Sequence, residues 1–288
     1  MQVSKAMLWF LSAALLLPLT SSAAEGFDSS KPIVVVSRED GSGTRGAFIE
    51  LLKIEVKTDD GRRKDMTTKE AIIARQTDVV MTTVANNKYA IGYISLGSLN
   101  KTIKAVVIDG IAASAENVKN GKYPISRPFN IATKGEPSAL AKDFIAFILS
   151  SNGQAVVAKN YVAVNSKAAA YTSKNLSGRI VVAGSSSVTP VMEKLKEAYT
   201  SVNPKVTIEI QMSDSSAGLS SAVAGACDIA MASRALKDSE KARLQSLTIA
   251  VDGLAVIVNN DNPIGNLSQD QVRAIFIGEA AKWSKVLK

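Results

Sequence analysis

The chain has 288 residues, of which 46% are hydrophobic, and a formal net charge of +8. This length is enough for two α/β domains, each with its own core. The chain contains no histidine, which excludes Ser-His-Asp and Cys-His nucleophilic sites and argues against ordinary zinc or haem sites. The positive charge suits a small anion as well as nucleic acid. Because the basic residues are scattered and only 5% of the chain is aromatic, a nucleic-acid partner is not expected.

The first 24 residues have the layout of a cleavable secretory signal. Lys5 precedes an apolar run from Ala6 to Leu19, and small residues stand just before Glu25. The run is too short for a bilayer span, and no later stretch reaches the roughly 18 apolar residues that a span requires. We therefore expect a mature protein that begins near Glu25 and works in the periplasm. Cys227 is the only cysteine and lies far from the cleavage point, which predicts neither a lipid anchor nor an internal disulfide.

The first predicted unit is a strand, a loop and a helix. Pro32 to Val36 is a continuous apolar run typical of a buried strand. The loop, Ser37 to Thr44, carries Arg38, Gly41 and Gly43, and the apolar residues Phe48, Leu51 and Leu52 then repeat with helical spacing. Further along we expect a helix from Thr68, strands at 90–94 and 105–108, and a helix at 137–149 that breaks or bends at 151–153.

A second and a third unit of the same kind follow a polar segment. Residues 165–176 are rich in Ser, Ala, Lys and Asn without an apolar stripe, which predicts a surface linker. Thr189 suits the N-cap of the next helix, and Pro190 suits its first turn. The other predicted elements are strands at 180–183, 206–211, 228–232 and 253–258, and helices to about Tyr199, at 219–224 and around 272–277. Alternating strands and helices predict mainly parallel sheets, with ligand sites at the carboxyl ends of the strands.

Small hydroxyl residues stand at four of these strand ends. Backbone N–H groups at the start of a helix bind anions with the help of the helix dipole, and Gly and Ser let an anion approach closely. Arg38 adds a guanidinium that can hold two oxygens of an oxyanion, and Asp40 could keep that guanidinium in place. The neutral donors that the other loops offer are Ser185, Ser186, Ser187, Ser215, Ser216 and Ser233. Together these residues predict an oxyanion site.

Two other interpretations of the same loops stay open. Gly/Ser loops are ordinary turns between strands and helices, and Arg38 by itself could be a surface charge. Gly41, Gly43 and Gly46 also fit the spacing of a dinucleotide fingerprint, with an acidic pair at 59–60 near the expected distance. However, the preceding strand ends in Ser-Arg-Glu-Asp and does not run into the first glycine. This favours an anion site over an NAD-dependent dehydrogenase.

Long motifs extend over nearly all of the mature chain. They are SREDGSGTRGAF, AIGYISLG, NVKNGKYPISRPF, GSSSVTPVMEKL, SSAGLSSAV, DIAMASRALKDSE and GLAVIVNNDNP. Together they closely resemble the phosphate-binding proteins of high-affinity phosphate ABC transporters, the PstS family. The resemblance implies a two-lobed α/β fold, periplasmic-binding-protein-like (type II). It also implies a monomeric, non-enzymatic protein without cofactor or metal that binds inorganic phosphate between the lobes and delivers it to the membrane permease subunits of an ABC transporter.

The resemblance also assigns roles to individual residues. The implied phosphate ligands are Arg38, Ser42, Gly43, Thr44, Ser186, Ser187, Ser215 and Ser233, and Asp40 would orient Arg38. Some relatives have an aspartate at the position of Ser233, which accepts a proton from phosphate and so rejects sulfate. Here Asp40 is the candidate substitute. A protein of the same fold for sulfate, molybdate or tungstate stays the alternative.

The order of the segments differs from the order in those relatives. Their GSSSVTP half precedes their SREDGSGTR half, whereas here it follows, which predicts a circular permutation; a gene misassembled from two tandem copies is the rival account. Joining residues 283–288 to residues 26–32 restores the usual run. The hinge is then expected to have two crossings, near Pro124 and Gly253. The predicted bounds are residues 25–122 with 253–288 for a split lobe A, and residues 123–252, including the linker 165–176, for a continuous lobe B.

Overall fold

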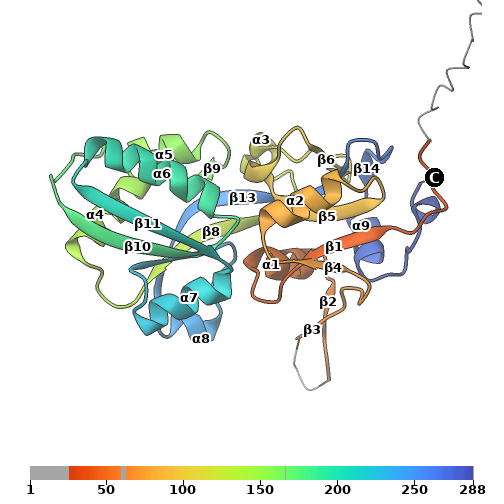
Figure 1. Cartoon of the computed structure of the whole chain (residues 1–288), viewed down its shortest axis with the longest axis horizontal. Coiled ribbons are helices and arrows are strands. Elements are labelled where there is room, and N and C mark those ends of the chain that lie inside the picture. Colours follow the sequence, from red (N-terminus) through yellow and green to blue (C-terminus); the bar gives the residue numbers. More distant parts are fainter. Residues whose placement is uncertain (1–25, 60–62, 166, 288) are drawn as a thin grey trace, which may run out of the picture.

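The computed structural model describes residues 26–59, 63–165 and 167–287, and its two lobes lie side by side (Figure 1). The predicted signal sequence and its cleavage point near Glu25 lie outside the described residues. Within the described part of the chain, no helix combines the length and the apolar character that a membrane span needs.

One ten-stranded sheet runs through both lobes in the order β11-β10-β12-β8-β13-β5-β1-β4, and β6 and β9 also pair with β13. Its strands are β1 (Val34–Arg38), β4 (Ile72–Ala74), β5 (Ala90–Ser95), β6 (Ile103–Ala105), β8 (Ser126–Thr133), β9 (Val162–Ala163), β10 (Gly178–Ser185), β11 (Val206–Ser213), β12 (Ile229–Ala232) and β13 (Gln245–Asn259). The outer strands of each lobe are parallel, as predicted. The central strands β8 and β13 are antiparallel to their neighbours, because the chain crosses between the lobes there and returns.

Helices cover both faces of this sheet (Figure 1). Lobe A has α1 (Gly43–Leu51), α2 (Thr77–Ala85), α3 (Ala115–Lys119) and α9 (Gln269–Phe276); lobe B has α4 (Ala139–Leu149), α5 (Ser151–Val157), α6 (Thr189–Val202), α7 (Ser215–Ala224) and α8 (Asp238–Lys241). The short elements are β2 (Glu55–Lys57), β3 (Arg63–Asp65), β7 (Val107–Ile108), β14 (Asn266–Leu267) and the 3-10 turns Leu96–Ser98 and Trp283–Lys285.

The predicted helix from Thr68 is wrong. Residues 72–74 form the edge strand β4, which pairs with β1, and helix α2 begins only at Thr77. A short apolar run fits a strand as well as a turn of helix, and here the free edge of β1 selects the strand. The N-cap prediction for Thr189 is also wrong. Val188 occupies the N-cap of α6, and Thr189 is the first helical residue.

Each lobe has its own hydrophobic core. Buried residues between Val35 and Ile125 and between Leu254 and Val286 form the cores of lobe A. Those of lobe B lie between Phe129 and Ala250. Lobe B is expected to begin at residue 123, but Tyr123 and Ile125 pack in the core of lobe A, which places the first crossing at the start of β8. These separate cores support the proposed division into a split and a continuous lobe.

The two crossing strands meet in a buried ion pair. Arg127 of β8 and Asp252 of β13 are partners in the strand register, and Asp252 Oδ2 lies 3.2 Å from Arg127 Nε and 3.1 Å from Nη2. The Ser95 hydroxyl of lobe A donates to Asp252 Oδ1 at 2.9 Å. Burial raises the pKa of Asp252 to about 6, even though Arg127 favours the charged form. A polar contact between the lobes is therefore built into the hinge.

The linker between the two halves is pinned at several points. Residues 167–176 form neither helix nor strand, as predicted. The Tyr171 hydroxyl donates to the buried carboxylate of Asp143 at 2.5 Å, and the Tyr199 hydroxyl donates to the same oxygen at 2.8 Å. The Tyr171 ring packs edge-on against Phe147, with ring centroids 5.2 Å apart. Side-chain contacts, together with the backbone hydrogen bond from Ser151 N to Ala169 O at 3.0 Å, therefore anchor this segment.

Candidate oxyanion-binding site

The site forms where strands end and helices begin on both sides of the interface between the lobes. From lobe A come Arg38, the last residue of β1, and Thr44, in the first turn of α1. From lobe B come the turn before α6, the first residue of α7 and the residue after β12. These lobe B residues are Ser186, Ser187, Ser215 and Ser233. The parallel order of the outer strands brings their carboxyl ends, and hence these loops, to one edge of the sheet in each lobe.

The hydroxyl groups of the two lobes are in direct contact. The Thr44 and Ser187 hydroxyl oxygens lie 2.7 Å apart, and Thr44 Oγ1 lies 3.5 Å from Ser233 Oγ. Within lobe B the Ser233 N–H donates to Ser215 Oγ at 3.1 Å, and the Ser185 hydroxyl donates to Ser233 Oγ at 2.9 Å. All of these serines and Thr44 are buried. The structure thus brings the predicted hydroxyl residues into one cluster.

Arg38 supplies the charge of the cluster and also joins the lobes. Its side chain is only 3% exposed, and Nη2 donates to Ser186 Oγ at 3.1 Å. The backbone N–H of Arg38 donates to the Tyr93 hydroxyl at 3.2 Å, and that hydroxyl also contacts Ser37 Oγ at 2.8 Å. Burial raises the pKa of Tyr93 to about 12, so it stays a neutral hydrogen-bonding group.

Asp40 does not orient Arg38, which corrects the prediction. Glu39 accepts two hydrogen bonds from the guanidinium, 2.8 Å from Nε and 2.7 Å from Nη2. The Asp40 side chain is 96% exposed and accepts from Arg45 Nη1 at 2.7 Å. The longer Glu39 side chain folds back over its neighbour, whereas Asp40 lies in the turn and points to solvent. Asp40 is therefore not placed to accept a proton from a ligand in the cluster.

Ser42 and Gly43 shape the start of α1. The Ser42 hydroxyl accepts from Arg45 N at 3.3 Å and caps the helix, while the Ser42 N–H donates to Glu39 O at 3.0 Å. The first N–H groups of a helix have no acceptor inside it, and for α1 these belong to Gly43 and Thr44. A Cβ on Gly43 would lie 2.4 Å from Ser215 Oγ and 2.8 Å from Ser233 Oγ. Only glycine lets α1 approach lobe B this closely.

Thr77 belongs to the same cluster, although the sequence did not identify it. It is the first residue of α2 and 3% exposed. Its hydroxyl oxygen lies 3.3 Å from both Ser186 Oγ and Ser187 Oγ, and 3.5 Å from Arg38 Nη1. The wrong prediction of a helix from Thr68 placed Thr77 in a helix interior. If residues 72–74 are predicted as a strand, Thr77 becomes one more hydroxyl residue that lies between a strand and a helix.

The close packing of the lobes argues against a dinucleotide in this loop. The carbonyl of Gly41 accepts from Ser216 N of lobe B at 3.2 Å, and a Cβ on Gly41 would lie 2.4 Å from the Asp214 carboxylate. Lobe B therefore covers the glycines that a pyrophosphate would have to approach. Within the described residues, no group of three or more His, Cys, Asp or Glu could hold a metal ion.

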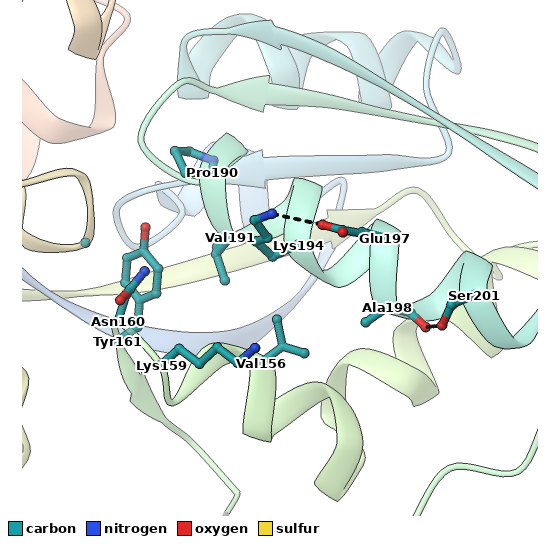
Figure 2. Close-up of a pocket in the computed structure, with 11 residues that line it drawn as sticks. Val156, Lys159, Asn160, Tyr161, Pro190, Val191, Lys194, Glu197, Ala198 and Ser201 are labelled. Atoms are coloured by element: carbon teal, nitrogen blue, oxygen red, sulfur yellow. Dashed lines mark hydrogen bonds and ion pairs between the residues drawn. The ribbon is translucent and has the colours of Figure 1, made fainter.

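A cavity of about 460 Å³ lies apart from the cluster, between α5 and α6 (Figure 2). Lys194 and Glu197 on its wall are paired with each other at 2.9 Å, and Lys159 and Tyr161 line its other side (Figure 2). None of the predicted oxyanion ligands lines it. The hydroxyl cluster between the lobes is therefore the stronger candidate for an anion site.

The chain is similar to known proteins at the level of the superfamily and of the family. A model described as "PBP superfamily domain" matches residues 22–152 and 168–288, which agrees with the two-lobed fold. The phosphate-binding protein PstS 2 of Streptococcus agalactiae serotype V is 50% identical over 273 residues, 94% of this chain and 93% of that protein. PstS 2 of Streptococcus pneumoniae serotype 4 is 46% identical over 266 residues, 92% of this chain and 91% of that protein. The chain belongs to the PstS family.

A solved structure supports the same assignment. The crystal structure of a phosphate-binding protein of a phosphate ABC transporter from Streptococcus pneumoniae TIGR4 superposes with a TM-score of 0.71, 46% sequence identity, and coverage of 89% of this chain and 100% of that one. The alignments with both PstS 2 proteins run through nearly the whole of each chain, so those relatives share the order of segments found here. This disfavours a misassembled gene. The circular permutation itself stays a prediction.

Proposed function

We propose that this protein binds inorganic phosphate between its two lobes and delivers it to the permease subunits of an ABC transporter. One observation carries the proposal: a buried guanidinium and hydroxyl groups from both lobes meet in one cluster, with Arg38 and Ser186 joined at 3.1 Å. The PstS 2 relatives and the superposed structure are named as phosphate-binding proteins, which supports phosphate as the ligand. The proposed ligands are Arg38, Ser42, Gly43, Thr44, Ser186, Ser187, Ser215 and Ser233.

Capture follows from lobe closure. In the closed arrangement Thr44 and Arg38 of lobe A meet Ser187 and Ser186 of lobe B, and these groups bond to one another. A phosphate between the lobes accepts hydrogen bonds from both sides in exchange for these contacts. Only the closed state presents both sets of donors, so ligand binding shifts the equilibrium toward it. The binding energy comes from charge-assisted hydrogen bonds and helix N-termini, without any covalent step.

Export and docking are part of the proposal. The signal-like first 24 residues support an extracytoplasmic location, periplasmic if the cell has an outer membrane. The superposed relative belongs to a phosphate ABC transporter, which supports permease subunits as partners. The proposed assembly is a monomer that meets the permease in its closed state.

Calorimetric titration of the purified protein with phosphate and then with sulfate tests the function. We expect saturable phosphate binding, weaker sulfate binding, and loss of phosphate binding in Arg38→Ala. Repeating both titrations at two pH values separates the ligands, because phosphate can donate a proton and sulfate cannot. A well-folded wild-type protein that binds sulfate or molybdate but not phosphate would overturn the assignment in favour of another oxyanion.

A further inference from the structure

We infer that Thr77 is a further phosphate-contacting residue of the cluster, and that helix α2 delivers it. This inference rests on the proposed function, because it concerns the same site. It adds a hydroxyl donor that the resemblance to the PstS family did not assign. It also adds the N-terminus of a fourth helix to those of α1, α6 and α7.

The contacts of Thr77 all lead into the cluster. Its hydroxyl lies 3.3 Å from Ser186 Oγ and 3.3 Å from Ser187 Oγ, both in lobe B, and Arg38 Nη1 lies 3.5 Å away in lobe A. A hydroxyl that is buried must find a partner or lose a hydrogen bond. For Thr77 the partners are three of the proposed ligands. A phosphate that separates Ser186 from Arg38 therefore also takes over the bonds of Thr77.

Thr83, on the same helix, uses its hydroxyl for a bond to its own helix. Thr83 is half-buried, and its hydroxyl donates to the carbonyl of Val79, one turn earlier in α2, at 2.7 Å. Thr77 is the first residue of α2 and has no such carbonyl behind it inside the helix. Its hydroxyl therefore points out of the helix end toward lobe B.

The N-terminus of α2 is also open toward the cluster. Its N-cap residue, Gln76, makes no capping hydrogen bond with its side chain. The N–H groups of Thr77 and Asp78 have no acceptor within the helix, whereas in α1 and α7 the side chains of Ser42 and Asp214 cap the first turn. An anion beside Thr77 can meet both the hydroxyl and the positive end of the helix dipole.

There is room for a ligand atom beside this helix end. A cavity of about 110 Å³ is lined by Thr77 of lobe A and Ser186 of lobe B. It exceeds the ~30 Å³ that a water molecule takes up in the liquid. Ser98 also lines the cavity, and its buried hydroxyl has no hydrogen-bond partner among the described residues. Thr77 and Ser186 thus both border a space that a ligand atom can enter.

The test compares Thr77→Val, Thr77→Ser and Thr83→Val by calorimetric titration with phosphate. Thr77→Val keeps the shape and removes the hydroxyl, and we expect phosphate affinity to fall about 10-fold, as for the loss of one hydrogen bond to a charged group. Thr77→Ser restores the hydroxyl and should bind within about 3-fold of wild type. Thr83→Val is the matched control on the same helix and should bind like wild type.

The outcomes for Thr77 and for the function are separate. If the wild-type protein does not bind phosphate, both the proposed function and this inference are wrong. If wild type binds, Arg38→Ala does not, and Thr77→Val binds within 2-fold of wild type, the function stands and Thr77 is only structural. Thermal unfolding verifies that each variant folds. If Thr77→Val does not fold, Thr77→Ala gives the same comparison, because it also removes the hydroxyl without placing a second methyl group in its position.

Discussion

Arg38 of lobe A donates a 3.1 Å hydrogen bond to Ser186 of lobe B, across the interface between the lobes. The bond joins the end of strand β1 to the turn before helix α6, two places 148 residues apart in the chain. Arg38 is buried, so its charge depends on fixed partners within the protein.

Glu39, and not Asp40, should stabilise the buried guanidinium. Glu39→Gln removes the charge that compensates Arg38, and we expect a loss of about 3 kcal/mol in the free energy of unfolding without phosphate, since one partner of a buried ion pair is removed. Asp40→Asn is the matched control, with an expected loss below about 1 kcal/mol because Asp40 is almost fully exposed. Urea unfolding measures both. Equal losses in the two variants would contradict the observed pairing.

Gly43→Ala should prevent full closure. The new methyl group would collide with the hydroxyls of Ser215 and Ser233, so the lobes have to stay further apart. We expect phosphate affinity to fall at least 10-fold while each lobe keeps its stability, because α1 tolerates alanine well. Titration calorimetry gives the affinity, and small-angle scattering gives the size with and without phosphate. Gly265→Ala, at a position with no atom within 4 Å of the added carbon, is the control and should close normally.

Tyr171→Phe should loosen the linker without affecting the ligand. It removes one of two tyrosine hydroxyls that donate to the buried Asp143 carboxylate. The expected loss is about 1–3 kcal/mol of unfolding free energy, the usual cost of an unsatisfied buried group. Phosphate affinity should stay within 2-fold of wild type, since Tyr171 contacts Asp143, Asn203 and Phe147 and none of the proposed ligands. Thr172→Ala, on the exposed neighbour, serves as the control in thermal melts; a Tyr171→Phe protein as stable as this control would refute the anchoring role.

Asp252 should make part of the stability depend on pH. Burial raises its pKa from the ordinary value of 3.8 to about 6, against the attraction of Arg127 and the hydrogen bond from Ser95. The folded state therefore holds a proton that the unfolded state has lost, and the stabilising contribution, complete below pH 3.8, is lost as the pH rises through 6.

Asp252→Asn cannot titrate and isolates this effect from other carboxylates. Urea unfolding at several pH values gives the difference in unfolding free energy between wild type and this variant. We expect the unfolding free energy of the wild type to fall relative to that of the variant as the pH rises from 3.8 to 6. A difference that stays constant over this interval would mean that the folded protein does not raise the pKa of Asp252.

Much of the site could be predicted from local sequence. The turns before α6 and α7 and the residue after β12 carry their serines because small donors suit helix starts, and the structure brings these serines together with Thr44. The partner of Arg38 could not be predicted. Glu39 and Asp40 are adjacent carboxylates, and only the direction of the turn decides that one folds over the guanidinium and the other faces solvent. Thr77 was missed for a similar reason, since a three-residue strand leaves too weak a pattern.

By itself, the sequence determined the two α/β lobes, the hydroxyl-rich strand ends, Arg38 as the cation among them, and the family. These features depend on residues close together in the chain, where hydrophobic spacing, glycine and helix starts act directly. The tertiary structure alone decided which loops meet. It set Thr77 against Ser186, Gly43 against Ser215, and Arg127 against Asp252, because such contacts depend on how two separately packed cores close on each other across the hinge strands. No local pattern encodes that geometry.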